Sequence, residues 1–565
     1  EQMIDELKCA PLLKGIRGQT AANIEALIDT LLKLGGEDGL LARFNHNIAE
    51  MDLNPVIIDD RGLSIADARF MVSQTGTNSS QVPPGVNSEP ILELLNHLFQ
   101  PRTIAVVGAS SKKIVIANTF IQRMKEFDYD GEIYPIHPKA SLIEGLKTYP
   151  DLSSTPKPVD YAYIAIGAAQ IPGILENANG NCKVAQVISS GFGEVAESKS
   201  LESDLVESAR KGQVRILGPN CLGTYSPRGG LTFPKDAPTE LGSIGVVSQS
   251  GGLSTDIVKR GQWKGLRFSG LVTIGNSADL TPADIIRYFL EDEHTTAIGL
   301  YVEDAKDGRE IFNLMRASKM IKPLVILKGG LSEQGAVAAA SHTGALAENN
   351  QSWFALCQQC CAVLVSTVDE FIDTLLALQF VDLQKDQPTQ NVTLFGNGGG
   401  ASVLGVDAFA DKNLSVSQFE QTATDKLQAL KLPAGTSVLN PIDTPVGTLL
   451  EKEGWIAAEI LDIVYRDTRT DAVVMHLNLA AFVGRGSVDP IDNLFAVMRK
   501  AKSEWSEPIH FILVLRSDGS EVIDNRKREL REVAQGYRIP VFDEIAPVAQ
   551  VLANIRHFEK QLSQL

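Results

Sequence analysis

The sequence predicts an α/β protein of several domains built on doubly wound parallel sheets. Short apolar runs alternate with helical stretches along most of the chain, a pattern typical of strands buried on both faces and joined by right-handed crossovers. Three of these runs lead directly into turns of small residues followed by a helical stretch. The length of 565 residues fits several domains, since a domain usually holds about 100–200 residues.

The first predicted domain covers residues 1–75. It contains an amphipathic helical stretch at Ala21–Leu34 and two strand-like runs at Ile48–Asp52 and Val56–Ile58. Residues 76–90 are rich in Ser, Asn, Gly and Pro and offer almost no apolar surface. We interpret them as a linker.

Three further domains are predicted at residues 91–226, 240–381 and 390–565, the last two separated by a Gln- and Asp-rich connection at Asp382–Thr389. In the first of them we expect helices such as Ala117–Phe127 and Leu201–Lys211 between the strands. The strands expected in the three domains are Thr103–Val107, Glu132–Ile136, Tyr161–Ile166, Ala185–Ser189 and Val214–Leu217; then Ser243–Val247, Leu271–Ile274, Ala297–Tyr301 and Leu324–Leu327; then Val392–Phe395, Ala472–Leu477, His510–Leu515 and Pro540–Phe542.

Composition excludes several classes of protein. The apolar fraction of 44% excludes a wholly disordered chain. A net charge of −17 without a basic block argues against nucleic acid as a partner. The sequence has no apolar run long enough to span a membrane. Six unevenly spaced cysteines and no signal peptide indicate a reducing compartment, so we expect a cytoplasmic protein.

The three small-residue turns are candidate anion sites. They are Gly108-Ala109-Ser110, Ser248–Gly252 and Gly396–Gly400. Such a turn exposes backbone N–H groups at the positive end of a helix dipole, where phosphate binds well. Each turn alone is explained equally well by packing. The first lacks the G-x-G-x-x-G pattern and an acid about twenty residues on, so a nucleotide-dependent oxidoreductase is a weak alternative.

Other loops of the 91–226 domain follow predicted strands and belong to the same expected sheet edge. They carry Lys139, Ser190 and Asn220. Ligands of open parallel sheets bind at the carboxyl ends of the strands. Lys139 is therefore a candidate partner for a phosphate group, with a solvated surface lysine as the alternative.

One histidine stands in a run of small residues, Ala338–Ala347. A neutral imidazole is a nucleophile at pH 7 and can accept a phosphoryl group. It needs a carboxylate to hold its other nitrogen, and Glu303 follows a predicted strand. The alternative is that His342 is a polar residue near a helix start, capped by Ser341 or Thr343.

Cys357, Cys360 and Cys361 are candidates either for a metal site or for buried thiols. Their spacing is that of one helix face, and no second pair of ligands lies nearby in the sequence. We expect buried structural thiols, and we expect Trp353 and Phe354 of the same helix to lie in the core.

Together, several motifs resemble the NDP-forming acyl-CoA synthetases of the succinyl-CoA synthetase superfamily. The matching segments span nearly the whole chain in the family's order for an arrangement that begins with the ATP-grasp domain. They are LLKGIRG (12–18), EMDLNPVIIDDRGLSIADAR (50–69), LGPNCLG (217–223), VVSQSGGLS (246–254), TIGNSADL (273–280), YVEDAKDG (301–308), SHTGALA (341–347) and FGNGGGASVLGVDA (395–408).

The resemblance implies a fold for each domain. Residues 1–75 are expected to be the C-terminal part of an ATP-grasp domain, and 91–226 a Rossmann-like CoA-binding domain. Residues 240–381 and 390–565 are expected to be flavodoxin-like CoA-ligase domains, the first carrying the phosphohistidine loop. No Lys-containing Gly-rich loop precedes residue 12, so we expect the chain to begin inside the ATP-grasp domain.

The resemblance also implies roles for single residues. His342 matches the histidine that is phosphorylated, and Glu303 matches the acid that steadies it. The helix starts that receive the phosphohistidine match Ser248, Ser250, Gly251, Gly252, Gly398, Gly399, Gly400 and Ala401. The loops that hold CoA match Gly108, Ala109, Ser110, Lys139, Ser190 and Asn220, and the ATP-grasp ligands of Mg²⁺ match Asn54 and Asp67.

The implied activity is an acid–thiol ligase that forms acyl-CoA from a carboxylic acid, CoA and ATP, and releases ADP and phosphate. The cofactors would be CoA, ATP and Mg²⁺, and the assembly a homodimer or larger homo-oligomer, without nucleic-acid or membrane partners. Two alternatives stay open: a non-catalytic CoA-binding regulatory module, and a CoA-dependent lyase built on the same chemistry.

Overall fold

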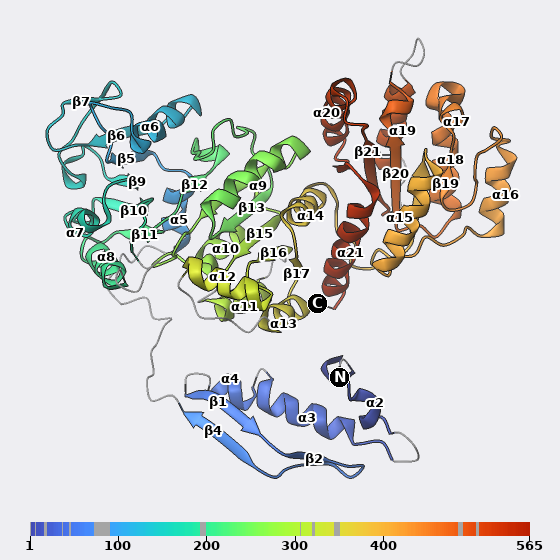
Figure 1. Cartoon of the computed structure of the whole chain (residues 1–565), viewed down its shortest axis with the longest axis horizontal. Coiled ribbons are helices and arrows are strands. Elements are labelled where there is room, and N and C mark those ends of the chain that lie inside the picture. Colours follow the sequence, from blue (N-terminus) through green and yellow to red (C-terminus); the bar gives the residue numbers. More distant parts are fainter. Residues whose placement is uncertain are drawn as a thin grey trace. The chain divides into compact units, whose positions relative to one another are not determined.

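The computed structural model (Figure 1) consists of two compact units, residues 1–86 and 87–565. It describes residues 2–5, 7–15, 20–36, 38–44, 47–72, 91–192, 199–304, 307–318, 322–343, 351–483, 490–503 and 508–564. None of the helices in these ranges is both long and apolar enough to cross a membrane.

The first unit has one longer helix, α3 (Ile24–Gly35), and two antiparallel strand pairs. The Asn23 side chain accepts a hydrogen bond from the Ala26 N–H at 2.9 Å and so caps the start of α3. The predicted helix and both predicted strands are confirmed. The other elements are α1 (Gln2–Asp5), α2 (Ala10–Leu13), α4 (Leu40–Arg43), β1 (Ile48–Leu53), β2 (Val56–Ile58), β3 (Leu63–Ile65) and β4 (Ala68–Val72).

The second unit begins with α5 (Ile91–Phe99) and a five-stranded parallel sheet in the order β6-β5-β9-β10-β11. Strand β5 (Thr103–Val107) is an interior strand and is wholly buried. The remaining elements are α6 (Ile116–Glu126), β6 (Glu132–Ile136), the hairpin β7 (Leu142–Ile143) and β8 (Leu146–Lys147), β9 (Val159–Ile164), α7 (Ile171–Glu176), β10 (Cys182–Val187), α8 (Lys199–Lys211) and β11 (Arg215–Leu217).

The next sheet, green to yellow in Figure 1, has the parallel order β14-β13-β15-β16-β17, with the short strand β12 (Thr224–Tyr225) antiparallel at one edge. Two of its strands, β12 and β17, were not predicted. The other elements are β13 (Ile244–Ser248), α9 (Gly251–Lys264), β14 (Phe268–Thr273), α10 (Pro282–Glu291), β15 (Ala297–Val302), α11 (Gly308–Ala317), β16 (Leu324–Lys328), α12 (Glu333–Thr343), α13 (Gln351–Gln359), β17 (Ala362–Val365) and α14 (Val368–Phe380).

The last sheet, orange to red, has the parallel order β19-β18-β20-β21-β22. In all three sheets the five parallel strands therefore lie in the chain order second-first-third-fourth-fifth, which is the flavodoxin-type arrangement. The elements are β18 (Val392–Gly396), α15 (Gly399–Asp411), α16 (Gln421–Ala429), β19 (Ile442–Asp443), α17 (Val446–Leu450), α18 (Ile456–Asp467), β20 (Ala472–Asn478), α19 (Pro490–Ser503), β21 (His510–Arg516), α20 (Glu521–Gly536), β22 (Val541–Phe542) and α21 (Ile545–Leu562).

Shared apolar cores join neighbouring sheets. Phe99 of α5 stacks on Tyr288 of α10 with ring centroids 4.3 Å apart, and one core cluster contains residues of the first two sheets. Helices α14 and α21 contribute Phe371 and Phe558 to a second cluster that contains residues of the last two sheets. The fold class predicted from the alternating pattern is confirmed.

The connection at Asp382–Thr389 is anchored to the last sheet region. The carboxylate of Glu559, a residue with 0% exposed surface, accepts hydrogen bonds from the N–H groups of Thr389 (2.7 Å) and Gln384 (3.1 Å). A third hydrogen bond joins Glu559 to the His510 ring at 2.7 Å. The polar composition that suggested a linker thus belongs to a segment held by a buried acid.

Candidate functional site

The first small-residue cradle, Ser248–Gly252, lies where β13 runs into α9. Ser250 is the N-cap of α9, and its hydroxyl accepts from the Leu253 N–H at 3.3 Å. The Ser248 hydroxyl accepts from the Ser250 N–H at 3.2 Å. Side chains of the turn therefore satisfy part of its own backbone, and the N–H groups of Gly251 and Gly252 remain at the helix start.

Glu303 lies beside this cradle because β13 and β15 are neighbours in the sheet, with Ser248 opposite Tyr301. The Gln249 side chain reaches across and accepts hydrogen bonds from the N–H groups of Glu303 and Asp304, the latter at 3.0 Å. The Tyr301 hydroxyl donates to the Glu303 carboxylate at 2.9 Å. These contacts hold the carboxylate at the carboxyl edge of the sheet.

His342 is placed only by its backbone, which lies in the last turn of α12. The sequence suggested a loop or a helix start here, but the helix that begins at Glu333 continues through Thr343. Residues 344–350, the rest of the predicted loop, lie outside the described part of the chain.

Strand β16 leads into α12 through Gly329 and Gly330, and so α12 begins at the edge that carries Glu303. A Cβ atom at position 329 would lie 3.1 Å from Glu303 Cγ. The Lys328 ammonium donates to the Glu303 carbonyl oxygen at 2.7 Å. The segment carrying His342 therefore starts in contact with the acid predicted to steady it.

The second cradle, Gly398–Ala401, starts helix α15 after β18. Its N-cap, Gly398, has φ +120°, a conformation that strains any residue with a Cβ atom, and no side chain caps this helix. The Gly398 N–H donates to the Asp443 carboxylate at 3.1 Å. The three following N–H groups thus lie at an uncapped helix start.

The two cradles are built on the same plan. Each follows the first parallel strand of its sheet in chain order, an interior strand, and the N–H of the next residue donates to the end of a neighbouring strand. Gln249 N–H donates to the Tyr301 carbonyl (3.1 Å), and Asn397 N–H donates to the His476 carbonyl (3.2 Å). The Asn397 side-chain oxygen accepts from the Asn478 N–H at 2.8 Å, as Gln249 does from the N–H of Glu303.

The cradles differ at the ends of the neighbouring strands. The position of Glu303 beside the first cradle corresponds to that of Asn478 beside the second, because each lies two residues beyond the partner of Ser248 or Gly396. The next strand places Gly329 beside Glu303 but Arg516 beside Asn478. At this corresponding position the first cradle has an acid, whereas the second has a cation in addition to Asp443 at the end of β19.

Arg516 and His476 were not identified from the sequence. The Arg516 guanidinium donates from Nη2 to the Asn397 carbonyl at 2.7 Å. His476 has no exposed surface and bonds Ser402 in the first turn of α15 through Nε2 at 3.1 Å. An arginine that ends an apolar run, HFILVLR, is the signal that indicates a cation at the carboxyl edge.

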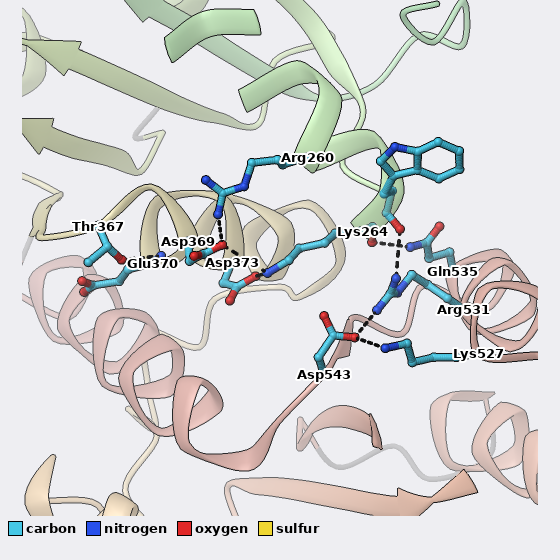
Figure 2. Close-up of polar contacts among 11 residues, drawn as sticks. Arg260, Lys264, Thr367, Asp369, Glu370, Asp373, Lys527, Arg531, Gln535 and Asp543 are labelled. Atoms are coloured by element: carbon cyan, nitrogen blue, oxygen red, sulfur yellow. Dashed lines mark hydrogen bonds and ion pairs between the residues drawn. The ribbon is translucent and has the colours of Figure 1, made fainter. Parts of the chain in front are cut away.

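The far end of α9 is held by polar side chains of α20 (Figure 2). Arg531 donates to the Trp263 carbonyl at 2.9 Å, and Gln535 donates to the Lys264 carbonyl at 2.7 Å. Within the same region Lys264 pairs with Asp373 of α14 at 2.6 Å. These donors satisfy carbonyl groups at the α9 C-terminus, where the helix dipole favours cations.

The loops predicted to hold CoA lie at the carboxyl edge of the first sheet, because all five strands are parallel. Gly108 has φ +105°, and a Cβ atom there would lie 2.3 Å from the Ala165 carbonyl. The buried Asn118 side chain fixes the turn by bonding both the N–H and the carbonyl of Ser110 at 2.9 Å. The sequence analysis missed Asn118, because this residue contacts Ser110 only when α6 folds back over the turn.

Ala109, the remaining predicted member of this turn, is buried at 3% exposure. The other three predicted residues, Lys139, Ser190 and Asn220, are exposed. Asn220 adopts a left-handed backbone (φ 59°), and its N–H donates to the Ser189 carbonyl at 3.1 Å. This hydrogen bond joins the loop that follows β10 to the loop that follows β11.

The predicted Mg²⁺ ligands Asn54 and Asp67 lie opposite each other just past the paired ends of β1 and β4. The Asn54 N–H donates to the Asp67 carbonyl oxygen at 3.1 Å. Both residues are exposed, and the Asp67 carboxylate accepts from the Ala68 N–H at 2.9 Å. Amide and carboxylate side chains offer the oxygen ligands that Mg²⁺ prefers.

The cysteines are free thiols, five of them buried. Among the described residues, no group of three His, Cys, Asp or Glu side chains is arranged to hold a metal. Burial raises the pKa of Cys357 and Cys361 to about 12, so these thiols stay protonated. Trp353 is buried as predicted, whereas Phe354 is 51% exposed and the prediction that it lies in the core is wrong.

Family models match three parts of the chain. A succinyl-CoA ligase-like flavodoxin domain matches residues 241–378, a CoA-binding domain matches 102–227, and an ATP-grasp domain matches 1–72. These matches agree with the fold assigned to each region.

Similar proteins of known function and structure extend this result. Acetate–CoA ligase (ADP-forming) II of Archaeoglobus fulgidus is 30% identical over 573 residues, which cover 100% of this chain and 79% of that protein. Subunit alpha of acetate–CoA ligase (ADP-forming) I of Pyrococcus furiosus is 36% identical, over 62% of this chain and 76% of the subunit.

A solved structure adds a match in three dimensions. Acetyl-coenzyme A synthetase 1 of Ca. Korarchaeum cryptofilum, solved with phosphate and ADP, is 26% identical and has a TM-score of 0.71 over 83% of this chain and 97% of that one. Sequence, family models and structure agree, and the chain belongs to the ADP-forming acyl-CoA synthetases, acid–thiol ligases of the succinyl-CoA synthetase superfamily.

Proposed function

We propose that this protein joins a carboxylic acid to CoA at the expense of ATP, through a phosphorylated His342 and an acyl phosphate. The observation that carries the proposal is the pair of glycine-bearing helix starts built on one plan, one of them beside Glu303. The relatives are named as ADP-forming ligases for acetate and 4-hydroxybutyrate, so acetate is the first substrate to test.

Three displacements account for the reaction. An imidazole nitrogen of His342 attacks the γ-phosphorus of ATP, and ADP leaves. A carboxylate oxygen of the acid then attacks that phosphorus, and the imidazole leaves as an acyl phosphate forms. Finally the CoA sulfur attacks the acyl carbon, the thiol proton is lost, and inorganic phosphate leaves.

The cradles stabilise the group that moves. A phosphoryl group on His342 carries close to two negative charges, and two helix N-termini provide N–H donors and positive dipole ends for it. Glu303, fixed by Tyr301 and Gln249, is suited to hold the second imidazole nitrogen and keep the first one nucleophilic.

The first sheet is proposed to bind CoA through Gly108, Ala109, Ser110, Lys139, Ser190 and Asn220. Support comes from the parallel edge that gathers these loops and from the Gly108 turn, which has no room for a Cβ atom. Asn54 and Asp67 would hold Mg²⁺, which neutralises charge on the phosphates of ATP.

The cellular setting is part of the same proposal. All six cysteines are free thiols, five of them buried, which suits the reducing cytoplasm. We also propose a homodimer or larger homo-oligomer, to be measured by light scattering at several concentrations.

The test uses the full chain. A panel of carboxylic acids is assayed for ADP release that depends on both acid and CoA. His342→Ala should lose turnover and an acid-labile, base-stable phosphoryl label from ATP, whereas Arg466→Met, an exposed substitution on α18, should keep both. Normal labelling of His342→Ala would refute the phosphohistidine route.

A further inference from the structure

We propose that Arg516 is a phosphoryl-binding residue of the second cradle, acting with the N–H groups at the start of α15. The inference rests on the proposed function for the identity of its ligand, a phosphoryl group with tetrahedral oxyanion geometry. The first cradle has no corresponding cation, because Gly329 occupies the equivalent position there.

The guanidinium of Arg516 lies directly against the start of α15. A Cβ atom on Gly398 would be 2.8 Å from Nη2 and 3.8 Å from Cζ of Arg516. The hydrogen bond from Nη2 to the Asn397 carbonyl fixes one arm of the guanidinium. The planar group is thus held beside the backbone that offers the N–H donors of residues 399–401.

The Arg516 guanidinium has a donor group without a hydrogen-bond partner among the described residues. This group is the buried Nε. Buried polar atoms of this kind nearly always have a partner, so an empty one points to a ligand or an ordered water. A guanidinium offers its N–H groups in a fork that fits two oxygens of a phosphate or carboxylate.

His476 provides a second, independent observation. Its ring is fully buried beneath the first turn of α15, with Nε2 bonded to Ser402 and with Nδ1 lacking a partner in the described part of the chain. Burial, and then the nearby Arg516 charge, lower the pKa of His476 to about 4, so the ring is neutral at pH 7. Two unpartnered nitrogens from neighbouring strands therefore lie under one uncapped helix start.

The turn has charges of both signs beside it. Asp443 binds the Gly398 N–H at 3.1 Å, and a Cβ atom on Gly399 would lie 2.8 Å from its Oδ2. One carboxylate therefore already lies near the turn, and an added anion needs a cation to offset the repulsion. Arg516 supplies that charge at the same helix start.

Inorganic phosphate is the probe for this inference, because it has the geometry of the transferred group and needs no turnover. Its affinity is measured by isothermal titration calorimetry on the complete protein without ATP, acid or CoA. Arg516→Met should weaken phosphate binding about 10- to 100-fold, since it removes charge-assisted hydrogen bonds. Arg516→Lys keeps the positive charge but not the forked guanidinium, so its phosphate affinity should lie between those of the parent and Arg516→Met.

Arg466→Met is the matched control, because it removes an exposed arginine of the same sheet region, 68% exposed and paired with Asp462. It should leave phosphate affinity within twofold of the parent. The inference is overturned if Arg516→Met, with an unchanged thermal transition, binds phosphate within twofold of the parent, if the parent binds none, or if Arg466→Met loses as much.

The two proposals fail separately. A protein that binds phosphate through Arg516 but releases no ADP with any acid would contradict only the proposed function. A protein that turns over with a normal KM for phosphate in the reverse direction after Arg516→Met would contradict only the inference.

Discussion

The two cradles show how one backbone plan is adapted to two chemical tasks. Gln249 and Asn397 hold corresponding strand ends in the same way. The first cradle, however, caps itself with Ser250 and is accompanied by Glu303, whereas the second has a bare Gly398 and Arg516. We infer that Glu303 holds a histidine and that Arg516 binds an anion. The residues at the ends of the neighbouring strands therefore make the two cradles different.

The largest expected effect is at the N-cap of the second cradle. Gly398→Ala puts a Cβ atom at φ +120° and 2.8 Å from Arg516, so turnover should fall about 100-fold as the donors shift. Unfolding free energy should fall by about 1–3 kcal/mol from backbone strain. Gly252→Ala in the first cradle meets no atom within 4 Å and should keep or slightly raise stability in the same urea titration. Equal destabilisation by both would contradict the comparison.

His476 makes the second cradle sensitive to pH. Its folded pKa is about 4 against an ordinary 6.5, so as pH falls below 6.5 the unfolded chain binds a proton that the folded chain does not. Stability from this residue is complete above pH 6.5 and is lost toward pH 4, by about 3 kcal/mol at most. Chemical denaturation of His476→Gln should show a shallower loss of stability between pH 6.5 and 4 than the parent. Identical dependence of stability on pH in the two proteins would contradict a lowered pKa of His476 in the folded chain.

The far end of α9 offers a stability comparison of intermediate size. Arg531 is 6% exposed and binds both Trp263 and Asp543, so Arg531→Met should cost about 1–3 kcal/mol. Arg260→Met removes a more exposed partner of Asp369 (Figure 2) and should cost less than about 1 kcal/mol. Thermal unfolding of the two variants in parallel measures the difference, and a larger loss for Arg260→Met would show that α20 does not anchor α9.

The smallest expected effect concerns the cap that only the first cradle has. Ser250→Ala removes the acceptor for the Leu253 N–H and should cost about 1 kcal/mol, whereas Ser250→Gly should cost a few tenths. Urea denaturation of both variants checks the order. If alanine is tolerated as well as glycine, the hydroxyl is not capping α9 in solution.

The parallel strands were predictable because they are buried on both faces, and their apolar runs end at charged or small residues. Strands Thr103–Val107 and Glu132–Ile136 were placed with their observed bounds. Strand β17 (Ala362–Val365) was missed because it follows a predicted helical stretch directly. No Gly or Pro between the two marks the end of the helix. His342 was expected in a loop because its neighbours are small, yet alanine also favours the helix that the structure shows.

The sequence by itself determined the fold class, the two helix starts at Gly251 and Gly399 and the candidate nucleophile, since each depends on residues close together in the chain. Only the tertiary structure decided which strand ends stand beside each helix start. Glu303, His476 and Arg516 acquire their places from strand order and register. Those pairings join residues tens to more than a hundred positions apart, and no local pattern encodes them.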